Sequence, residues 1–138
     1  MTVLGFFYTA INARVDEKNL FGSINVTSTP TIESVEKKDL TGAGMTETIG
    51  IRFKYETKYE QAGEIILSGE VIYKVDDAKK AEKMWKDSKR MDDEIAVDVL
   101  NFILRRCVAK TIELSDVLRL PPPVQFPVIT KQPKAKKE

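Results

Sequence analysis

The stretch that decides the fold is residues 91–126, MDDEIAVDVLNFILRRCVAKTIELSDVLRLPPPVQF. Its apolar residues recur at helical spacing, which predicts one long helix over 91–118 that begins near Asp92 or Asp93. Three consecutive prolines follow, and proline cannot donate a backbone hydrogen bond or continue a helix. The segment 118–129, LRLPPPVQFPVI, is nevertheless apolar. It can be neither a helix nor a central strand, so its apolar side chains need another explanation.

The predicted long helix has an apolar face wider than one sheet can cover. A helix on a single sheet needs an apolar arc of about 100°, and this arc is roughly twice as wide. Its central positions are Ile95, Val99, Phe102, Ile103, Cys107 and Val108, and the face is widened by Ala96, Val97, Leu100, Leu104, Thr111 and Ile112. One side is expected to pack on a sheet. The remainder must contact another surface, because a large exposed apolar patch is a liability.

Two possibilities are open for what packs against this remaining apolar face. Either a shorter helix or the C-terminal segment of the same chain covers it, or a second copy of the chain does. Isologous dimers are the commonest soluble oligomers, so the sequence favours a homo-oligomer, a dimer or a tetramer built from dimers. The helix residues predicted to form the interface between copies are Ile95, Val99, Leu100, Phe102, Ile103 and Cys107.

Before the helix, four stretches alternate with the period of a β-strand. They are residues 3–15, 23–38, 47–60 and 63–75. Short glycine-containing links separate the later ones, so antiparallel neighbours in a four-stranded meander or a near relative are expected. Pro30 cannot donate to a strand ladder, which places its strand at an edge or a bulge.

A charged helix over 76–89, capped by Asp76 or Asp77, is expected to link the last strand to the long helix. The tail 130–138, TKQPKAKKE, is expected to be flexible and charged. The sequence therefore predicts a single α+β domain over 1–129. In it, a four-stranded antiparallel sheet packs on one short and one long C-terminal helix.

The composition argues against several classes of function. The chain has 22 basic and 21 acidic residues, which gives no overall electrostatic case for nucleic acid binding. It has no histidine, the usual general base and commonest metal ligand. Its one cysteine, Cys107, lies within the apolar helix face and is expected to be a small core residue. An enzyme is not expected, and no catalytic residue, metal or cofactor is predicted, although carboxylate or lysine chemistry stays formally open.

Acidic residues at 92–94 could resemble a metal cluster, but acids at a helix start are expected from the helix dipole. No run approaches the roughly 20 apolar residues of a membrane span. The N-terminus, MTVLGFFYTA, lacks the basic region of a signal peptide. The expected location is therefore the cytoplasm, without stable membrane insertion.

The predicted layout and the end of the chain resemble the SecB-type export chaperones. In that family a proline-bearing segment with a Pro-Val-Asn-Phe motif follows the long oligomerising helix. Here LRLPPPVQF follows the helical run NFILRRCVAKTIEL, and Pro123, Val124, Gln125 and Phe126 stand where the family has its motif. The highly charged linking helix and the basic tail depart from the family. The chain is therefore closer to divergent SecB-like proteins outside classical export, including those that guard labile antitoxins.

The resemblance implies an ATP-independent chaperone, a holdase, that binds unfolded or precursor polypeptides in apolar grooves, in protein export or antitoxin control. It implies that the proline segment helps to wall such a groove, although a simple C-terminal lid over the core is equally open. The candidate groove residues are Phe6, Tyr8, Leu104, Val108, Leu120, Val124 and Phe126. The alternatives are an oligomeric adaptor for one dedicated protein and a carrier of a small molecule or lipid.

Overall fold

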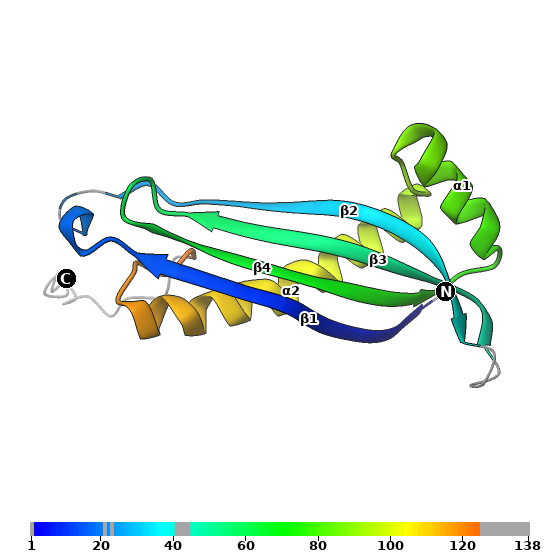
Figure 1. The fold of residues 1–138 in the computed structure, drawn as a ribbon, viewed down its shortest axis with the longest axis horizontal. Coiled ribbons are helices and arrows are strands. Elements are labelled where there is room, and N and C mark those ends of the chain that lie inside the picture. The colour runs from blue at the N-terminus through cyan, green and yellow to red at the C-terminus, as the bar shows by residue number, and fades with distance from the viewer. Residues whose placement is uncertain (1, 21, 23, 41–44, 125–138) are drawn as a thin grey trace, which may run out of the picture.

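Residues 2–20, 22, 24–40 and 45–124 are described by a computed structural model. They form an elongated antiparallel sheet with a long helix across one face and a short helix at one end (Figure 1). The elements are β1 (Thr2–Val15), β2 (Thr27–Leu40), β3 (Met45–Lys58), β4 (Gly63–Lys74), α1 (Ala78–Ser88) and α2 (Asp93–Leu118). The predicted α+β architecture is confirmed. The tail 130–138 and the boundary predicted at 129 lie outside the described residues.

The strand order is β1-β4-β3-β2, and every neighbouring pair is antiparallel. The sheet is a near relative of a meander, the second of the two predicted alternatives: short links join β2, β3 and β4 in turn, whereas β1 pairs with β4. The connection after β1 passes the end of the sheet at the β3–β4 hairpin, where the Asp16 amide donates to the Ala62 carbonyl over 2.7 Å. Both β1 and β2 are therefore edge strands, and Pro30 lies in an edge strand as predicted.

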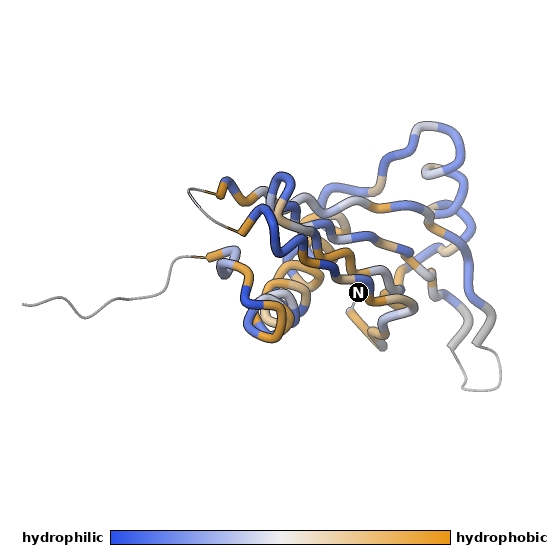
Figure 2. Tube along the Cα trace, turned by 60° about the vertical axis from the view of Figure 1, so that its left-hand side comes forward, coloured by the Kyte–Doolittle hydropathy of each residue, from blue (hydrophilic) through white to orange (hydrophobic). Residues whose placement is uncertain are grey.

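The two central strands supply most of the core, on the face that α2 covers. Their alternating apolar residues are buried, as the alternation within 47–60 and 63–75 predicts: Ile49, Ile51, Phe53 and Tyr55 in β3, and Ile65, Leu67, Val71 and Tyr73 in β4. Viewed after a 60° turn, apolar positions gather where the sheet and α2 meet (Figure 2). The sheet is thus half-buried, with one apolar and one polar face.

The long helix lies obliquely across the sheet and buries every fourth residue. The buried row is Ile95, Val99, Ile103, Cys107, Thr111 and Ser115. The Asp92 carboxylate caps the helix by accepting a bond from the Glu94 amide over 3.0 Å. The Tyr73 hydroxyl donates to the Asp98 carboxylate over 2.7 Å and ties the helix to β4. Burial and this carboxylate raise the pKa of Tyr73.

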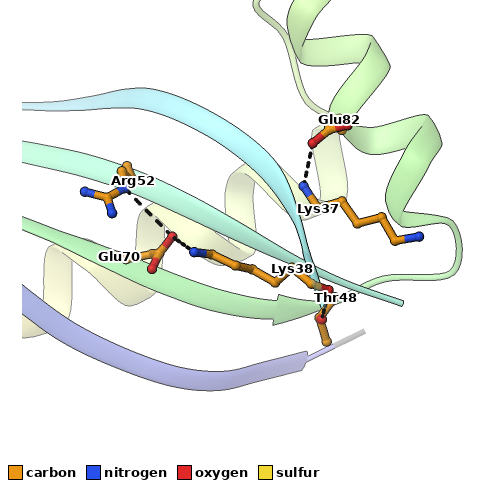
Figure 3. A network of polar contacts seen from close by, with 6 residues as sticks. All are labelled: Lys37, Lys38, Thr48, Arg52, Glu70 and Glu82. Carbon is orange, nitrogen blue, oxygen red and sulfur yellow. Dashed lines mark hydrogen bonds and ion pairs between the residues drawn. The ribbon is translucent and has the colours of Figure 1, made fainter. Parts of the chain in front are cut away.

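An ion pair around a buried carboxylate crosses three strands on the opposite, polar face of the sheet (Figure 3). Glu70 on β4 is only 3% exposed, and its carboxylate lies 3.1 Å from the Lys38 ammonium of β2 and 4.0 Å from the Arg52 guanidinium of β3. Lys38 reaches Glu70 across Gly50 on β3, where a Cβ would overlap both side chains. The glycine therefore provides the space for the pair.

Replacement of Gly50 by alanine should displace this ion pair. We expect Gly50→Ala to lower the free energy of unfolding by about 1–2 kcal/mol, because Glu70 would lose a partner while remaining buried. The control is Gly5→Ala on the same face, where a Cβ would meet Ile72 at an ordinary 3.7 Å. Urea unfolding should show no loss for the control. Equal losses for the two variants would contradict the explanation.

Candidate functional site

An aromatic cluster joins β1 to one flank of α2. The Phe6 ring stacks on Phe53 at 5.3 Å between centroids and lies 5.5 Å from Phe102 and 5.1 Å from Tyr8. The Arg106 guanidinium lies 5.4 Å from the Phe6 ring and 5.5 Å from the Phe102 ring. Because Arg106 is exposed and Phe6, Tyr8 and Phe102 are half-buried, the cluster offers part of its surface to solvent.

Tyr8 within this cluster and Cys107 next to it are held in their neutral forms. The Tyr8 hydroxyl donates to the Arg106 carbonyl over 3.2 Å, and burial together with Cys107 raises the pKa of Tyr8 to about 12. Burial likewise raises the pKa of the Cys107 thiol to about 12. The thiol is fully buried and protonated at neutral pH, so it is a core residue as predicted and not a nucleophile.

The outer edge of β1 carries exposed apolar side chains. Leu4, Phe7 and Ile11 are 37%, 46% and 49% exposed, and β1 is paired only with β4 within the described residues. Its pairing is interrupted at Leu4 and at Thr9, where single residues shift the register. Between Thr2 and Val15 the only charged residue is Arg14, so the edge lacks most of the charges that normally block strand addition. The edge is therefore suited to receive another chain.

The other flank of α2 presents a second apolar surface. Successive helical residues are turned by about 100°, so Leu104 and Val108 lie on the opposite side of the buried row from Phe102 and Arg106. Leu104 and Val108 are half-buried, and Val97 nearby on the helix is 60% exposed. The structure thus brings Phe6 and Tyr8 together on one flank and places Leu104 and Val108 on the other, so the predicted groove residues do not form one row.

The proline segment begins with a tight helix ending. Arg119 adopts a left-handed conformation with φ 59°, and the Leu120 amide donates to the Ser115 carbonyl over 2.9 Å. This turn directs Leu120 into the core, where it is 4% exposed, so Leu120 anchors the segment. Val124 is half-buried, and Phe126 lies outside the described residues.

The residues predicted to form the oligomer interface also fall into two groups. Ile95, Val99, Ile103 and Cys107 face the sheet and are at most 7% exposed, whereas Leu100 and Phe102 are half-buried. Only these last two retain surface that a second copy could reach. The contact of Arg106 with two aromatic rings was missed by the sequence analysis, although its position four residues after Phe102 was the available signal.

A cavity of about 240 Å³ lies between α1 and the start of α2. Its walls are apolar at Ile49, Ala81, Met84, Met91 and Ile95, and acidic residues stand at its rim. Among the residues that the structure describes, no group of three or more acidic, cysteine or histidine side chains is arranged to hold a metal ion. No helix in the described part of the chain is long and apolar enough to cross a membrane.

Comparisons with known proteins identify the fold. Neither a protein-family model nor a curated protein sequence matches the chain. The SecB-like chaperone Rv1957 of Mycobacterium tuberculosis, solved in complex with a peptide from the HigA1 antitoxin, is similar in structure, with a TM-score of 0.59 and 9% identity. The match covers 94% of this chain and 87% of that chain. A Streptococcus agalactiae protein of unknown function has a TM-score of 0.44 and 10% identity, over 92% and 96% of the two chains.

The half-buried Tyr8 and the buried Cys107 predict a loss of stability in alkaline solution. Their pKa values rise from 10.0 and 9.0 to about 12 on folding, so the unfolded chain releases these protons at lower pH than the folded one. Their contribution to stability should be complete below about pH 9 and should fall as the pH rises towards 12. Urea unfolding between pH 8 and about pH 11 measures this loss. Cys107→Ala should make it shallower, and an unchanged slope would contradict the assignment.

Proposed function

We propose that the protein is an ATP-independent holdase chaperone that binds unfolded or precursor polypeptides through apolar surfaces, in protein export or antitoxin control. The observation that carries the proposal is the apolar surface left open beside α2 and along β1 in a chain with the SecB-like fold. The antitoxin peptide bound by the structural neighbour supports a polypeptide as the ligand. The proposal places the protein in the cytoplasm.

The mechanism needs only burial of apolar surface and mass action. An unfolded client exposes apolar side chains, and their burial contributes about 25 cal/mol per Å². A chaperone that binds the unfolded state and not the native state shifts the folding equilibrium of the client by binding alone. We assign Leu104, Val108 and Val124 to one client surface and Phe6 with Tyr8 to the other. The buried Leu120 anchors the start of the proline segment, and Phe126 remains a candidate.

The two flanks of α2 give the proposed client site a definite geometry. An extended polypeptide advances about 3.3 Å per residue, so an apolar segment of about ten residues spans roughly 33 Å. The 26 residues of α2 extend for about 39 Å. A single client segment can therefore follow one flank along most of the helix, and a second segment can follow the other.

Loss of the apolar side chains of one flank should weaken client binding. We expect the double variant Leu104→Ser with Val108→Ser to bind reduced, carboxymethylated α-lactalbumin about ten-fold more weakly, since it loses apolar contact area. Fluorescence anisotropy gives the affinity. The matched control is Val117→Ser, which removes an apolar side chain that is 71% exposed on the same helix. Client binding that is equally weak in both variants, or unchanged in the double variant, would contradict the assignment.

The second candidate function is an oligomeric adaptor that binds one dedicated folded protein. The observation that favours it is that most side chains of the two apolar surfaces, Phe6, Tyr8, Leu104 and Val108 among them, are only half-exposed. An adaptor should bind its partner saturably and leave the aggregation of chemically unfolded clients unchanged. Light scattering of an aggregating client, with and without the protein, separates the two functions.

We also propose that the protein is a homo-oligomer, a dimer or a tetramer, and that the free edge of β1 contributes to the contact. Two antiparallel β1 strands related by a two-fold axis would bury Leu4 and Ile11 and satisfy the unpaired backbone groups of the edge. Leu100 and Phe102 on α2 are the members of the predicted interface helix that keep exposed surface for a further contact.

A charge introduced on the β1 edge should therefore weaken the association of the copies. We expect Ile11→Lys to lower the mass measured by light scattering after size exclusion, because a buried lysine in the new strand pair would be unfavourable. Asn12→Lys adds the same charge to the adjacent exposed position and is the control. An oligomer that both variants preserve would exclude the β1 edge from the contact.

A further inference from the structure

The short helix α1 concentrates the positive charge of the chain. Residues 79–90 contain six basic residues, Lys79, Lys80, Lys83, Lys86, Lys89 and Arg90, and two acidic ones, Glu82 and Asp87. This local net charge of +4 belongs to a chain whose net charge is +1, so the rest of the chain is net negative by three. We call these six side chains the α1 basic surface. The near-neutral total therefore hides a strongly uneven distribution.

Packing fixes the direction in which the α1 basic surface points. Ala78 is fully buried, and Ala81 and Trp85 pack against the core, so the opposite side of the helix faces solvent. All six basic side chains are exposed. The helix stands at the end of the sheet away from the C-terminal end of α2, and its course is largely hydrophilic (Figures 1 and 2).

Of the two carboxylates within this surface, that of Glu82 is already engaged. Glu82 accepts a hydrogen bond from the Lys37 amide over 2.8 Å and lies 3.7 Å from the Lys86 ammonium. These contacts, the Lys37 amide first, lower the pKa of Glu82. Lys89 lies 5.9 Å from the centre of the Trp85 ring. Within the described residues, no ion pair engages Lys79, Lys83 or Arg90. Their charges are therefore available to a partner.

The surroundings of α1 select the kind of partner. Asp76 and Asp77 precede the helix, and acidic residues at 92–94 follow it, so negative charge stands at both ends of the basic surface. A long polyanion such as duplex nucleic acid would meet these carboxylates and be repelled. Insertion of the helix into an anionic bilayer would need its apolar side, which is packed against the core. The 11 residues of α1 are about 16 Å long, which matches one short peptide segment.

We propose that the α1 basic surface docks a short acidic segment, rich in aspartate and glutamate, of a partner protein. Lysine ammonium groups and the Arg90 guanidinium would pair with the carboxylates, and the partner would approach the end of the molecule away from the proline segment. This docking goes beyond client binding and does not depend on it, because no residue of the proposed client surfaces takes part.

The full-length protein is the sample for the test, with a fluorescein-labelled six-residue peptide of alternating glutamate and alanine as the probe, which is about 20 Å long when extended. We expect the peptide to bind and its affinity to fall at least ten-fold in the double variant Lys79→Glu with Lys83→Glu. The control is Lys18→Glu with Arg105→Glu, which makes the same charge change at exposed residues outside α1 and should alter the affinity less than two-fold. Equal effects in the two double variants would overturn the proposal.

Trp85 is the only tryptophan of the chain and lies on α1, so its emission reports docking directly. The acidic peptide should shift this emission, and the shift should disappear with the affinity in the α1 variant. Duplex RNA of twenty base pairs and phosphatidylserine vesicles are tested in parallel. Tighter binding of either than of the peptide, or a peptide that does not bind, would overturn the proposal, whether or not unfolded clients are bound.

Discussion

The packing of α2 obliquely across one face of the sheet is the contact on which the rest of the structure depends. The row from Ile95 to Ser115 meets the buried side chains of β3 and β4 and closes the core. A single helix covers only a strip of a sheet whose strands are up to 14 residues long. Apolar side chains therefore remain open on both flanks of α2 and at the β1 edge. The proposed client surfaces follow from this incomplete cover.

The polar face of the sheet is organised by a different constraint. Glu70 is buried there because Lys38 reaches it across Gly50, and the pair joins three strands. A buried charge is tolerable only when it is paired, so the pair and the glycine depend on one another. The proposed contacts with other chains use the apolar face and the β1 edge, so they leave this charge pairing undisturbed.

Charge and apolar surface are separated along the molecule. The α1 basic surface stands at one end of the elongated sheet, and the helix end with the proline segment stands at the other (Figure 1). A client held along α2 and an acidic partner on α1 would contact different elements. The separation allows a partner to be recognised by charge and a client by apolar burial, which are different physical interactions with different dependence on salt.

The sequence alone determined the strands β3 and β4 and their buried faces and the end of α2 before the prolines, and it narrowed each helix start to two candidate caps and Pro30 to an edge strand or a bulge. These features depend on alternation, capping and proline chemistry between near neighbours in the chain. The tertiary structure decided that β1 pairs with β4, that Leu104 and Phe6 lie on opposite flanks of α2, and that Glu70 is buried. Each of these depends on residues distant in sequence, whose contacts are set by how the helix crosses the sheet and which strands meet.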